Sequence, residues 1–308
     1  MDVSLRRIVA LDVGGTAIKS GMVIGSPRNA AGLWVANGGE SGAVGLVQLA
    51  RSPIDSNAAA NVIVQTLVDA CHRLIGPSGR ATGLAIAFPG PCDYARGIPY
   101  LTDFGKFDTL YGCDVKAMIT ARLASPLPIS FVNDAAAAAL GEALARQLVG
   151  RTLMITLGTG FGSAFLDGAK ISRESFPWSS TGELSLEPAF GMRADDVFSI
   201  RGLDHRLAAH GTSCRHLAET ASQAYIRADI AGELYRFGSD LGTWLAPYIT
   251  AAKASLLIVG GGLAAYFPWF GPTLTDAVAI PSEAAILGDA AAVIGATSHW
   301  TVEHTLKS

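Results

Sequence analysis

Short apolar runs recur along this chain, and glycine, proline or asparagine bounds each of them. Such runs, with their β-branched residues, are typical of buried strands. Between them lie longer stretches with a helical period, one of which is rich in alanine and opens with an aspartate. Strands that alternate with helices predict an α/β protein. The expected strands lie at 6–13, 19–24, 83–90, 128–134, 152–158, 162–168 and 255–262. The expected helices lie at 57–75 and 134–148, with one or two more within 213–252.

One strand–turn–strand pattern occurs twice. The stretch VALDVGGTAIKSGMV near the start is echoed by MITLGTGFGSAFL, with Asp12 opposite Thr156 and Gly14 opposite Gly158. A repeated unit of this kind predicts two related domains, each of which contributes one turn to a shared cleft. The length of 308 residues also exceeds the usual size of a single core, which agrees with two domains.

Composition and charge narrow the possible functions. Half of the residues are apolar and 16% are charged, which predicts a compact globular protein. The net charge of -3 is spread without runs, so the basic stripe of a nucleic-acid binder is missing. The apolar runs are too short for a membrane helix or a secretion signal, and we expect a cytoplasmic protein without a membrane partner. The four cysteines, Cys71, Cys92, Cys113 and Cys214, form no C-x-x-C pair and are expected to be reduced.

The glycine turns have a chemical interpretation. Glycine lets several backbone N–H groups approach one anion, so such a turn can hold phosphate oxygens. At the first turn Thr16 can add a hydroxyl donor and Lys19 a positive charge, although Lys19 can equally point to solvent. Asp12 cannot bind phosphate itself, so its expected role is to hold Mg²⁺ directly or through water. A plain hairpin is the alternative, because neither the P-loop nor the dinucleotide signature is present.

A third glycine group, LLIVGGGLAAYF, follows an apolar strand and precedes a helical run. In order, the three groups resemble the phosphate 1, phosphate 2 and adenosine motifs of the sugar-kinase, actin and Hsp70 superfamily of ATPases. Within that superfamily the chain is similar to the ROK family of bacterial sugar kinases and regulators. The matching segments are LDVGGTAIKSGMV, AIAFPGPCDYARG, FVNDAAAAALGEA, ITLGTGFGSAFLDG, GELS, IVGGG and AAILGDAAAVIGA.

The resemblance implies a fold and a donor site. It implies a ribonuclease-H-like, actin-like ATPase domain in each half, at 1–132 together with 289–308 and at 133–288. ATP and Mg²⁺ would bind in the interdomain cleft, the acceptor would be a sugar, and the protein would be a homodimer. The residues assigned to the nucleotide are Gly14, Gly15, Thr16, Lys19, Gly158, Thr159, Gly160, Gly261 and Gly262, with Asp12 at the Mg²⁺.

The pair Asn133 and Asp134 stands where a predicted strand gives way to a helix. For an isolated aspartate at such a place the ordinary interpretation is an N-cap. The resemblance implies instead that Asp134 is the general base for the sugar hydroxyl and that Asn133 binds the sugar. It implies that Glu183 accepts hydrogen bonds from sugar hydroxyls, whereas most glutamates are solvated surface residues. Gly90 and Asp103 stand in segments that match the loop over the sugar.

The chain departs from the family pattern at the zinc site. Leu186 stands where the family commonly has a histidine ligand, and the segment FGMRADDVFSIRGL has none of the cysteines of the family's cluster. We therefore expect no zinc site, and folding and activity that do not need zinc. Asp195 loosely matches a second sugar-binding glutamate of the family. These departures leave the identity of the sugar open.

Several functions fit these residues. A glucokinase-like kinase for a hexose or amino sugar accounts for Asp134, Glu183 and both phosphate turns together. A ROK repressor that binds DNA is disfavoured, because the first strand begins near Arg6 and leaves no room for a helix-turn-helix. A non-catalytic sugar or nucleotide sensor agrees with the altered zinc segment. A polyphosphate-dependent hexose kinase would have similar phosphate turns, and the retained Asp134 favours a kinase over a sensor.

Overall fold

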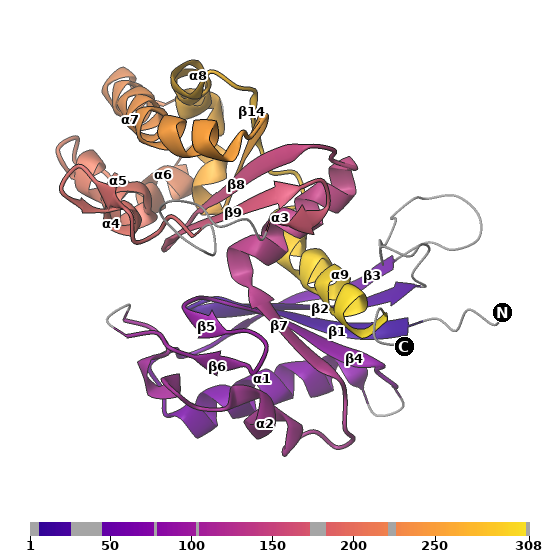
Figure 1. Ribbon diagram of the computed structural model, residues 1–308. Helices are drawn as coiled ribbons and strands as arrows, with labels where there is room; N and C mark the ends of the chain where they lie inside the picture. The colour runs from indigo at the N-terminus through magenta and orange to yellow at the C-terminus, as the bar shows by residue number, and fades with distance from the viewer. Residues whose placement is uncertain are drawn as a thin grey trace. The chain divides into compact units, whose positions relative to one another are not determined.

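The chain divides into two compact units, each with a five-stranded sheet and helices (Figure 1). Unit 1 comprises Met1–Leu148 and Asp289–Ser308, and unit 2 comprises Val149–Gly288. The predicted α/β class is confirmed. The computed structural model describes residues 6–25, 45–76, 79–102, 105–172, 183–220 and 226–305.

The sheet of unit 1 is built around a central apolar strand, β1, that is buried from Ile8 to Val13. β1 pairs antiparallel with β2 on one side and parallel with β4 on the other. β3 extends the antiparallel side and β7 the parallel side. The order is β3-β2-β1-β4-β7, with bounds β1 Arg6–Val13, β2 Ala17–Gly25, β3 Gly45–Pro53, β4 Gly83–Phe88 and β7 Ile129–Asn133.

The sheet of unit 2 repeats this arrangement. Its central strand, β8, pairs antiparallel with β9 and parallel with β13, and β10 and β14 are the two edges. The duplicated strand–turn–strand pattern of the sequence therefore corresponds to β1–β2 and β8–β9, and the prediction of two related domains is confirmed. The order is β10-β9-β8-β13-β14, with bounds β8 Arg151–Leu157, β9 Phe161–Asp167, β10 Lys170–Ile171, β13 Leu256–Gly260 and β14 Ser282–Ala284.

Helices α3 (Asp134–Arg146) and α9 (Ala291–Thr305) of unit 1 lie side by side and touch through their backbones (Figure 1). A Cβ on Gly141 would lie 2.0 Å from the Ala291 carbonyl oxygen, and one on Gly295 would lie 1.8 Å from that of Ala137. A side chain at either glycine would therefore push the helices apart. The remaining short elements of unit 1 are α1 Ala60–Ile75, β5 Cys92–Asp93, β6 Ile98–Pro99, η1 Asp108–Leu110 and α2 Val115–Thr120.

The packing of α3 on α9 explains where the chain divides. The sequence analysis placed the first division between residues 132 and 133, at the end of β7. The structure places it after Leu148, because α3 packs with α9 in unit 1 and ends at Gln147 in the left-handed conformation. The short helix η3 (Gly288–Ala290) spans the second division.

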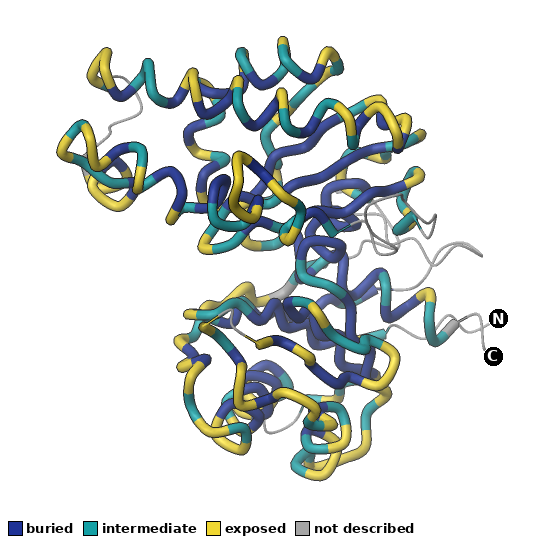
Figure 2. The backbone as a smooth tube through the Cα atoms, turned by 60° about the vertical axis from the view of Figure 1, so that its left-hand side comes forward, coloured by how far each residue is buried: buried dark blue, intermediate teal, exposed yellow. Residues whose placement is uncertain are grey.

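The core of unit 2 lies between its sheet and a group of helices. The paired helices α7 and α8 approach so closely that a Cβ on Gly238 would lie 2.1 Å from the Phe270 carbonyl oxygen. Figure 2 shows buried backbone along the strands of both sheets. The other elements of unit 2 are β11 Pro188–Ala189, β12 Met192–Arg193, α4 Ala194–Phe198, α5 Ile200–Ala208, α6 Cys214–Thr220, α7 Ala228–Ala252, η2 Gly262–Tyr266 and α8 Phe267–Val278.

Two general features bear on function. Within the described ranges, no helix has the length and apolar content needed to span a bilayer. None of the four cysteines, all of which are described, forms a disulfide. Cys71 and Cys214 are buried, and Cys92 and Cys113 are half-buried.

Candidate functional site

The first glycine turn joins β1 to β2 and leaves two backbone donors unused. The Gly14 N–H donates to the Ala17 carbonyl oxygen at 3.0 Å, which closes the turn. The N–H groups of Gly15 and Thr16 make no hydrogen bond within the part of the chain that the structure describes. Two adjacent unpaired N–H groups can hold an anion, as the sequence predicts for this turn.

The second turn joins β8 to β9 and is held at both ends. The Gly158 N–H donates to the Gly160 carbonyl oxygen at 2.9 Å, and the Ile200 N–H at the start of α5 donates to the Gly158 carbonyl oxygen at 2.7 Å. Among the described residues, the N–H groups of Thr159 and Gly160 have no acceptor. This turn therefore presents a pair of donors comparable to that of the first turn.

Asp195 fixes the strand that leaves the second turn. Its Oδ1 accepts the Phe161 N–H at 2.7 Å, and its Oδ2 pairs with the Arg201 guanidinium at 3.0 Å. A Cβ on Gly160 would lie 2.9 Å from the same Oδ1, so glycine is required for this approach. The resemblance placed Asp195 loosely at a sugar-binding position, and in the structure its carboxylate accepts a backbone N–H beside the second glycine turn.

The third glycine group follows β13. Gly261 has φ +82°, which favours glycine, and a Cβ there would lie 2.4 Å from the Leu157 carbonyl oxygen. The Ala264 N–H donates to the Gly261 carbonyl oxygen at 3.1 Å, and Gly262 opens the short helix η2. Both glycines are exposed, so the backbone at this place is open to a ligand.

Asp12 and Lys19 face each other across the β1–β2 hairpin. The Lys19 ammonium lies 3.0 Å from Asp12 Oδ2 and 3.4 Å from Asp289 Oδ1. Burial raises the pKa of Asp12, Lys19 opposes this, and the negative charges of Asp134 and Asp289 add to it. Burial acts to lower the pKa of Lys19, but the two carboxylates raise it overall. Lys19 therefore already has two anionic partners.

Asn133 and Asp134 hold separate positions at the β7–α3 junction. Asn133 is the N-cap of α3, because its Oδ1 accepts the Ala136 N–H at 3.0 Å. Asp134 is the first helical residue, and its Oδ1 accepts the Ala135 N–H at 2.8 Å. The ordinary interpretation of Asp134 as the N-cap is therefore wrong, because the residue before it holds that position. The half-buried carboxylate of Asp134 raises the pKa of Asp12, so the two acids interact electrostatically.

Sequence reasoning missed Tyr94 as a partner of this junction. The Asn133 Nδ2 donates to the Tyr94 hydroxyl oxygen at 3.0 Å. Tyr94 lies in FPGPCDYARG, the segment that the resemblance assigns to the loop over the sugar, but a tyrosine there carries no signal of its own. The hydrogen bond fixes the amide of Asn133 from the side opposite to the helix.

The other residues that the resemblance assigns to the sugar have different environments. Glu183 is half-buried, and the next residue, Leu184, donates its N–H to Ser163 Oγ at 2.8 Å. Gly90 is half-buried after β4, and its bond to Pro91 is cis. Asp103 lies outside the described residues.

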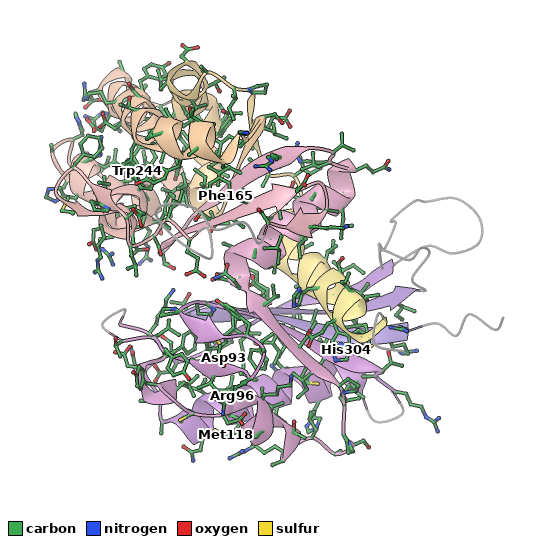
Figure 3. All side chains as sticks on the ribbon, viewed as in Figure 1. Asp93, Arg96, Met118, Phe165, Trp244 and His304 are labelled. Carbon is green, nitrogen blue, oxygen red and sulfur yellow. The ribbon has the colours of Figure 1, made fainter. Side chains whose placement is uncertain are left out.

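Aromatic side chains occupy the region of the family's zinc cluster. Trp244 of α7, labelled in Figure 3, donates its Nε1–H to the Pro188 carbonyl oxygen of β11 at 2.9 Å. The Phe198 ring lies 5.2 Å from the Trp244 ring and 6.2 Å from that of Phe190, between their centroids. In the described ranges no three His, Cys, Asp or Glu side chains gather as they would around a metal ion. Leu186, in place of the ligand histidine, is 54% exposed.

Comparisons with known proteins agree with the resemblance. Residues 35–176 match the model of the ROK family. A β-glucoside kinase from Klebsiella pneumoniae is 25% identical over 321 residues, which cover 96% of this chain and 96% of that protein. A ROK family glucokinase from Streptomyces griseus, solved in complex with glucose and AMPPNP, superposes with a TM-score of 0.73 at 21% identity, over 95% of this chain and 98% of that chain.

A further solved structure is that of an inorganic polyphosphate/ATP-glucomannokinase from Arthrobacter sp. strain KM. It superposes with a TM-score of 0.69 at 23% identity, over 97% of this chain and 100% of that chain. The two superpositions confirm the actin-like ATPase fold for both units. The match of residues 35–176 to the ROK family model agrees with the resemblance predicted from the sequence.

Proposed function

We propose that this protein is a sugar kinase that transfers the terminal phosphate of ATP to a hydroxyl group of a hexose or amino sugar. The observation that carries the proposal is the β7–α3 junction. There, Asn133 takes the N-cap, and Asp134 accepts the Ala135 N–H through Oδ1, so its Oδ2 makes no hydrogen bond with the described residues. The first glycine turn lies in the same unit, and the negative charge of Asp134 raises the pKa of Asp12 beside that turn.

In this proposal Asp134 accepts the proton of the attacking sugar hydroxyl. Phosphoryl transfer has a loose transition state, so the carboxylate acts mainly by orienting the hydroxyl oxygen toward the phosphorus. Asp134 Oδ1 accepts the Ala135 N–H at 2.8 Å, and this hydrogen bond holds the side chain in one rotamer. A fixed carboxylate oxygen is the requirement for this role.

The donor phosphates bind at the glycine turns. Each turn offers two N–H groups that have no acceptor among the described residues, at Gly15 and Thr16 and at Thr159 and Gly160, and such groups suit phosphate oxygens. Asp12 would hold Mg²⁺ directly or through water, and Mg²⁺ would neutralise the charge that develops on the transferred phosphate. Gly261 and Gly262 would approach the adenosine.

In unit 1, Asn133 would bind the acceptor sugar. Asn133 is fixed by Tyr94 and by its capping bond, so it can discriminate between sugars by geometry. Glu183, Gly90 and Asp103 complete the proposed acceptor set. A polyphosphate donor in place of ATP is the second candidate, and the solved polyphosphate/ATP-glucomannokinase of similar fold favours testing it.

The first experiment is a panel of hexoses and amino sugars, tested with ATP and with polyphosphate. Once an acceptor is found, Asp134→Asn is compared with the parent. We expect turnover to fall about 10²-fold to 10⁴-fold, because the amide cannot accept the proton. ATP affinity and the melting temperature should change little, since Asn133 supplies the cap of α3.

The matched control is Asn133→Asp, which keeps an oxygen for the Ala136 N–H but replaces the amide that donates to Tyr94. This control should retain the cap and weaken sugar binding, seen as a raised KM for the sugar. An Asp134→Asn protein that phosphorylates the sugar within a few-fold of the parent rate would exclude Asp134 as the base. A sensor, in contrast, would bind sugar or nucleotide without turnover in the parent itself.

A further inference from the structure

Lys19, the cation that the sequence assigns to the donor phosphates, is already neutralised. Its ammonium group contacts Asp12 Oδ2 at 3.0 Å and Asp289 Oδ1 at 3.4 Å. Both carboxylates raise the pKa of Lys19, so its ammonium group stays charged beside them. A lysine with two anionic partners attracts a third anion weakly, because its field is largely cancelled. The first turn therefore needs another cation if it is to bind a phosphate chain well.

Lys106 is placed to be that cation. Its side chain lies over Gly15, since a Cβ on Gly15 would be 3.4 Å from Lys106 Cδ and 3.8 Å from Lys106 Cβ. Lys106 is half-buried, and its ammonium group forms no ion pair or hydrogen bond with any residue in the described ranges. A half-buried cation without a partner is costly unless a ligand supplies the negative charge.

The segment that carries Lys106 is anchored to unit 1. Phe107 is fully buried, its N–H donates to the Ser56 carbonyl oxygen at 2.8 Å, and its ring lies 5.1 Å from the Phe88 ring. Ser56 also faces the turn, because its Oγ would lie 3.9 Å from a Cβ on Gly15. The backbone beside Lys106 is thus fixed with respect to the turn. Only the flexible stem of the lysine has to move to meet a ligand.

We infer that Lys106 contacts the phosphates of the donor at the first glycine turn. It would supply the positive charge that the sequence analysis predicted for Lys19. This inference rests on the proposed kinase function. The ligand chemistry is a chain of phosphoanhydrides, which ATP and inorganic polyphosphate share. The unpaired N–H groups of Gly15 and Thr16 would bind oxygens of the same chain, and Lys106 would add a point charge.

The test compares Lys106→Met, Lys106→Arg and the control Lys116→Met. Lys116 lies in the same unit, and its ammonium group bonds to the Ala95 carbonyl oxygen at 3.4 Å, so the control removes the same charge from another place. Binding of Mg²⁺-tripolyphosphate and of AMPPNP is measured by calorimetry, and KM values for ATP, polyphosphate and the sugar are measured by coupled assay.

We expect Lys106→Met to weaken tripolyphosphate and AMPPNP binding about 10-fold to 100-fold, as for the loss of one charged hydrogen bond. The KM for the sugar should stay within twofold, Lys106→Arg should recover most of the affinity, and Lys116→Met should behave as the parent. Equal weakening with both ligands assigns Lys106 to the shared phosphates. Weakening with one alone identifies the donor that the site is built for, and also supports the inference.

The inference is overturned if Lys106→Met binds both ligands within twofold of the parent, or if the variant raises only the KM for the sugar. A melting temperature equal to that of the parent shows that the variant is folded, and Lys106→Gln replaces it if the methionine aggregates. A parent protein that binds neither ligand refutes the proposed function, and the inference with it. A parent that binds and a variant that binds equally well refute the inference alone.

Discussion

At the β7–α3 junction, Asn133 and Asp134 are neighbours in sequence but hold different positions in the helix. Asparagine and aspartate cap helices about equally well, so the sequence ND leaves open which of the two is the cap. The structure assigns the cap to Asn133 and makes Asp134 the first residue of the helix. Similarly, the side-chain partners of Lys19 include Asp289, which is far away in sequence and reaches β2 only because α9 returns to unit 1. No local pattern predicts such a contact.

The four cysteines give a prediction at the scale of single residues. Burial raises the pKa of Cys71 to about 12 and also raises that of Cys214. Alkylation needs the thiolate, and at pH 8 only about 10⁻⁴ of a thiol with that pKa is ionised. We therefore expect iodoacetamide at pH 8 to label the half-buried Cys92 and Cys113 in the native protein, and Cys71 and Cys214 only after unfolding.

Peptide mass spectrometry at successive times measures this order. Labelling of the buried pair should stay slow as the pH rises above 8 until the protein unfolds, because burial hides both thiols and raises their pKa. Native labelling of Cys71 as fast as that of Cys113 would contradict the burial of α1 against the sheet.

At the scale of elements, the sequence predicts what is locally repetitive. The two hairpins, β4, β7, β13 and the helices α1 and α3 follow from apolar runs and helical period, within a few residues of their observed bounds. β3 was not predicted, because GLVQLARSP alternates weakly and becomes a strand by pairing with β2. The three-residue β14 was missed for the same reason, since it is an edge strand defined by its pairing with β13.

The second turn gives a prediction at this scale. Asp195 accepts the Phe161 N–H at 2.7 Å, whereas the neighbouring Asp196 binds Arg193 and Arg201 without contacting the turn. We expect Asp195→Ala to loosen the turn and raise the KM for the phosphate donor about tenfold, because the N–H groups of Thr159 and Gly160 lose their fixed geometry. Asp196→Ala should leave that KM within twofold.

Hydrogen exchange gives a readout that does not depend on turnover. The Phe161 amide should exchange faster in Asp195→Ala than in Asp195→Asn, because asparagine keeps an acceptor oxygen. If Asp195→Ala raises the KM for the sugar and leaves that for the donor unchanged, Asp195 contacts the acceptor, as the loose family match suggested, and the positioning role is wrong.

At the scale of the whole molecule, aromatic side chains pack in the part of unit 2 where the family commonly has a zinc cluster. The β11–β12 hairpin lies between Glu183 and Asp195 in the chain. Two backbone hydrogen bonds close it: the Ala194 N–H donates to the Glu187 carbonyl oxygen at 2.9 Å, and the Asp195 N–H donates to the Ser185 carbonyl oxygen at 3.0 Å. In the family a zinc cluster follows this glutamate, and here the rings of Phe198 and Trp244 pack against the hairpin. Apolar packing can stabilise a hairpin as a metal does, but it needs no thiolate ligands.

This substitution predicts how the protein responds to chelators and to the loss of Trp244. With excess chelator we expect the melting temperature to stay constant, because the described residues gather no set of zinc ligands, while sugar phosphorylation should stop for lack of Mg²⁺. Trp244→Ala should destabilise unit 2 by about 2–4 kcal/mol, somewhat less than a fully buried tryptophan, because Trp244 is only half-buried. Trp244→Phe keeps the ring packing and loses only the bond to Pro188, so it should cost about 1 kcal/mol. Calorimetric melting of the three proteins, with and without chelator, measures both effects. Stoichiometric zinc in the purified parent, together with a melting temperature that falls on chelation, would show that a metal and not the aromatic cluster holds the hairpin.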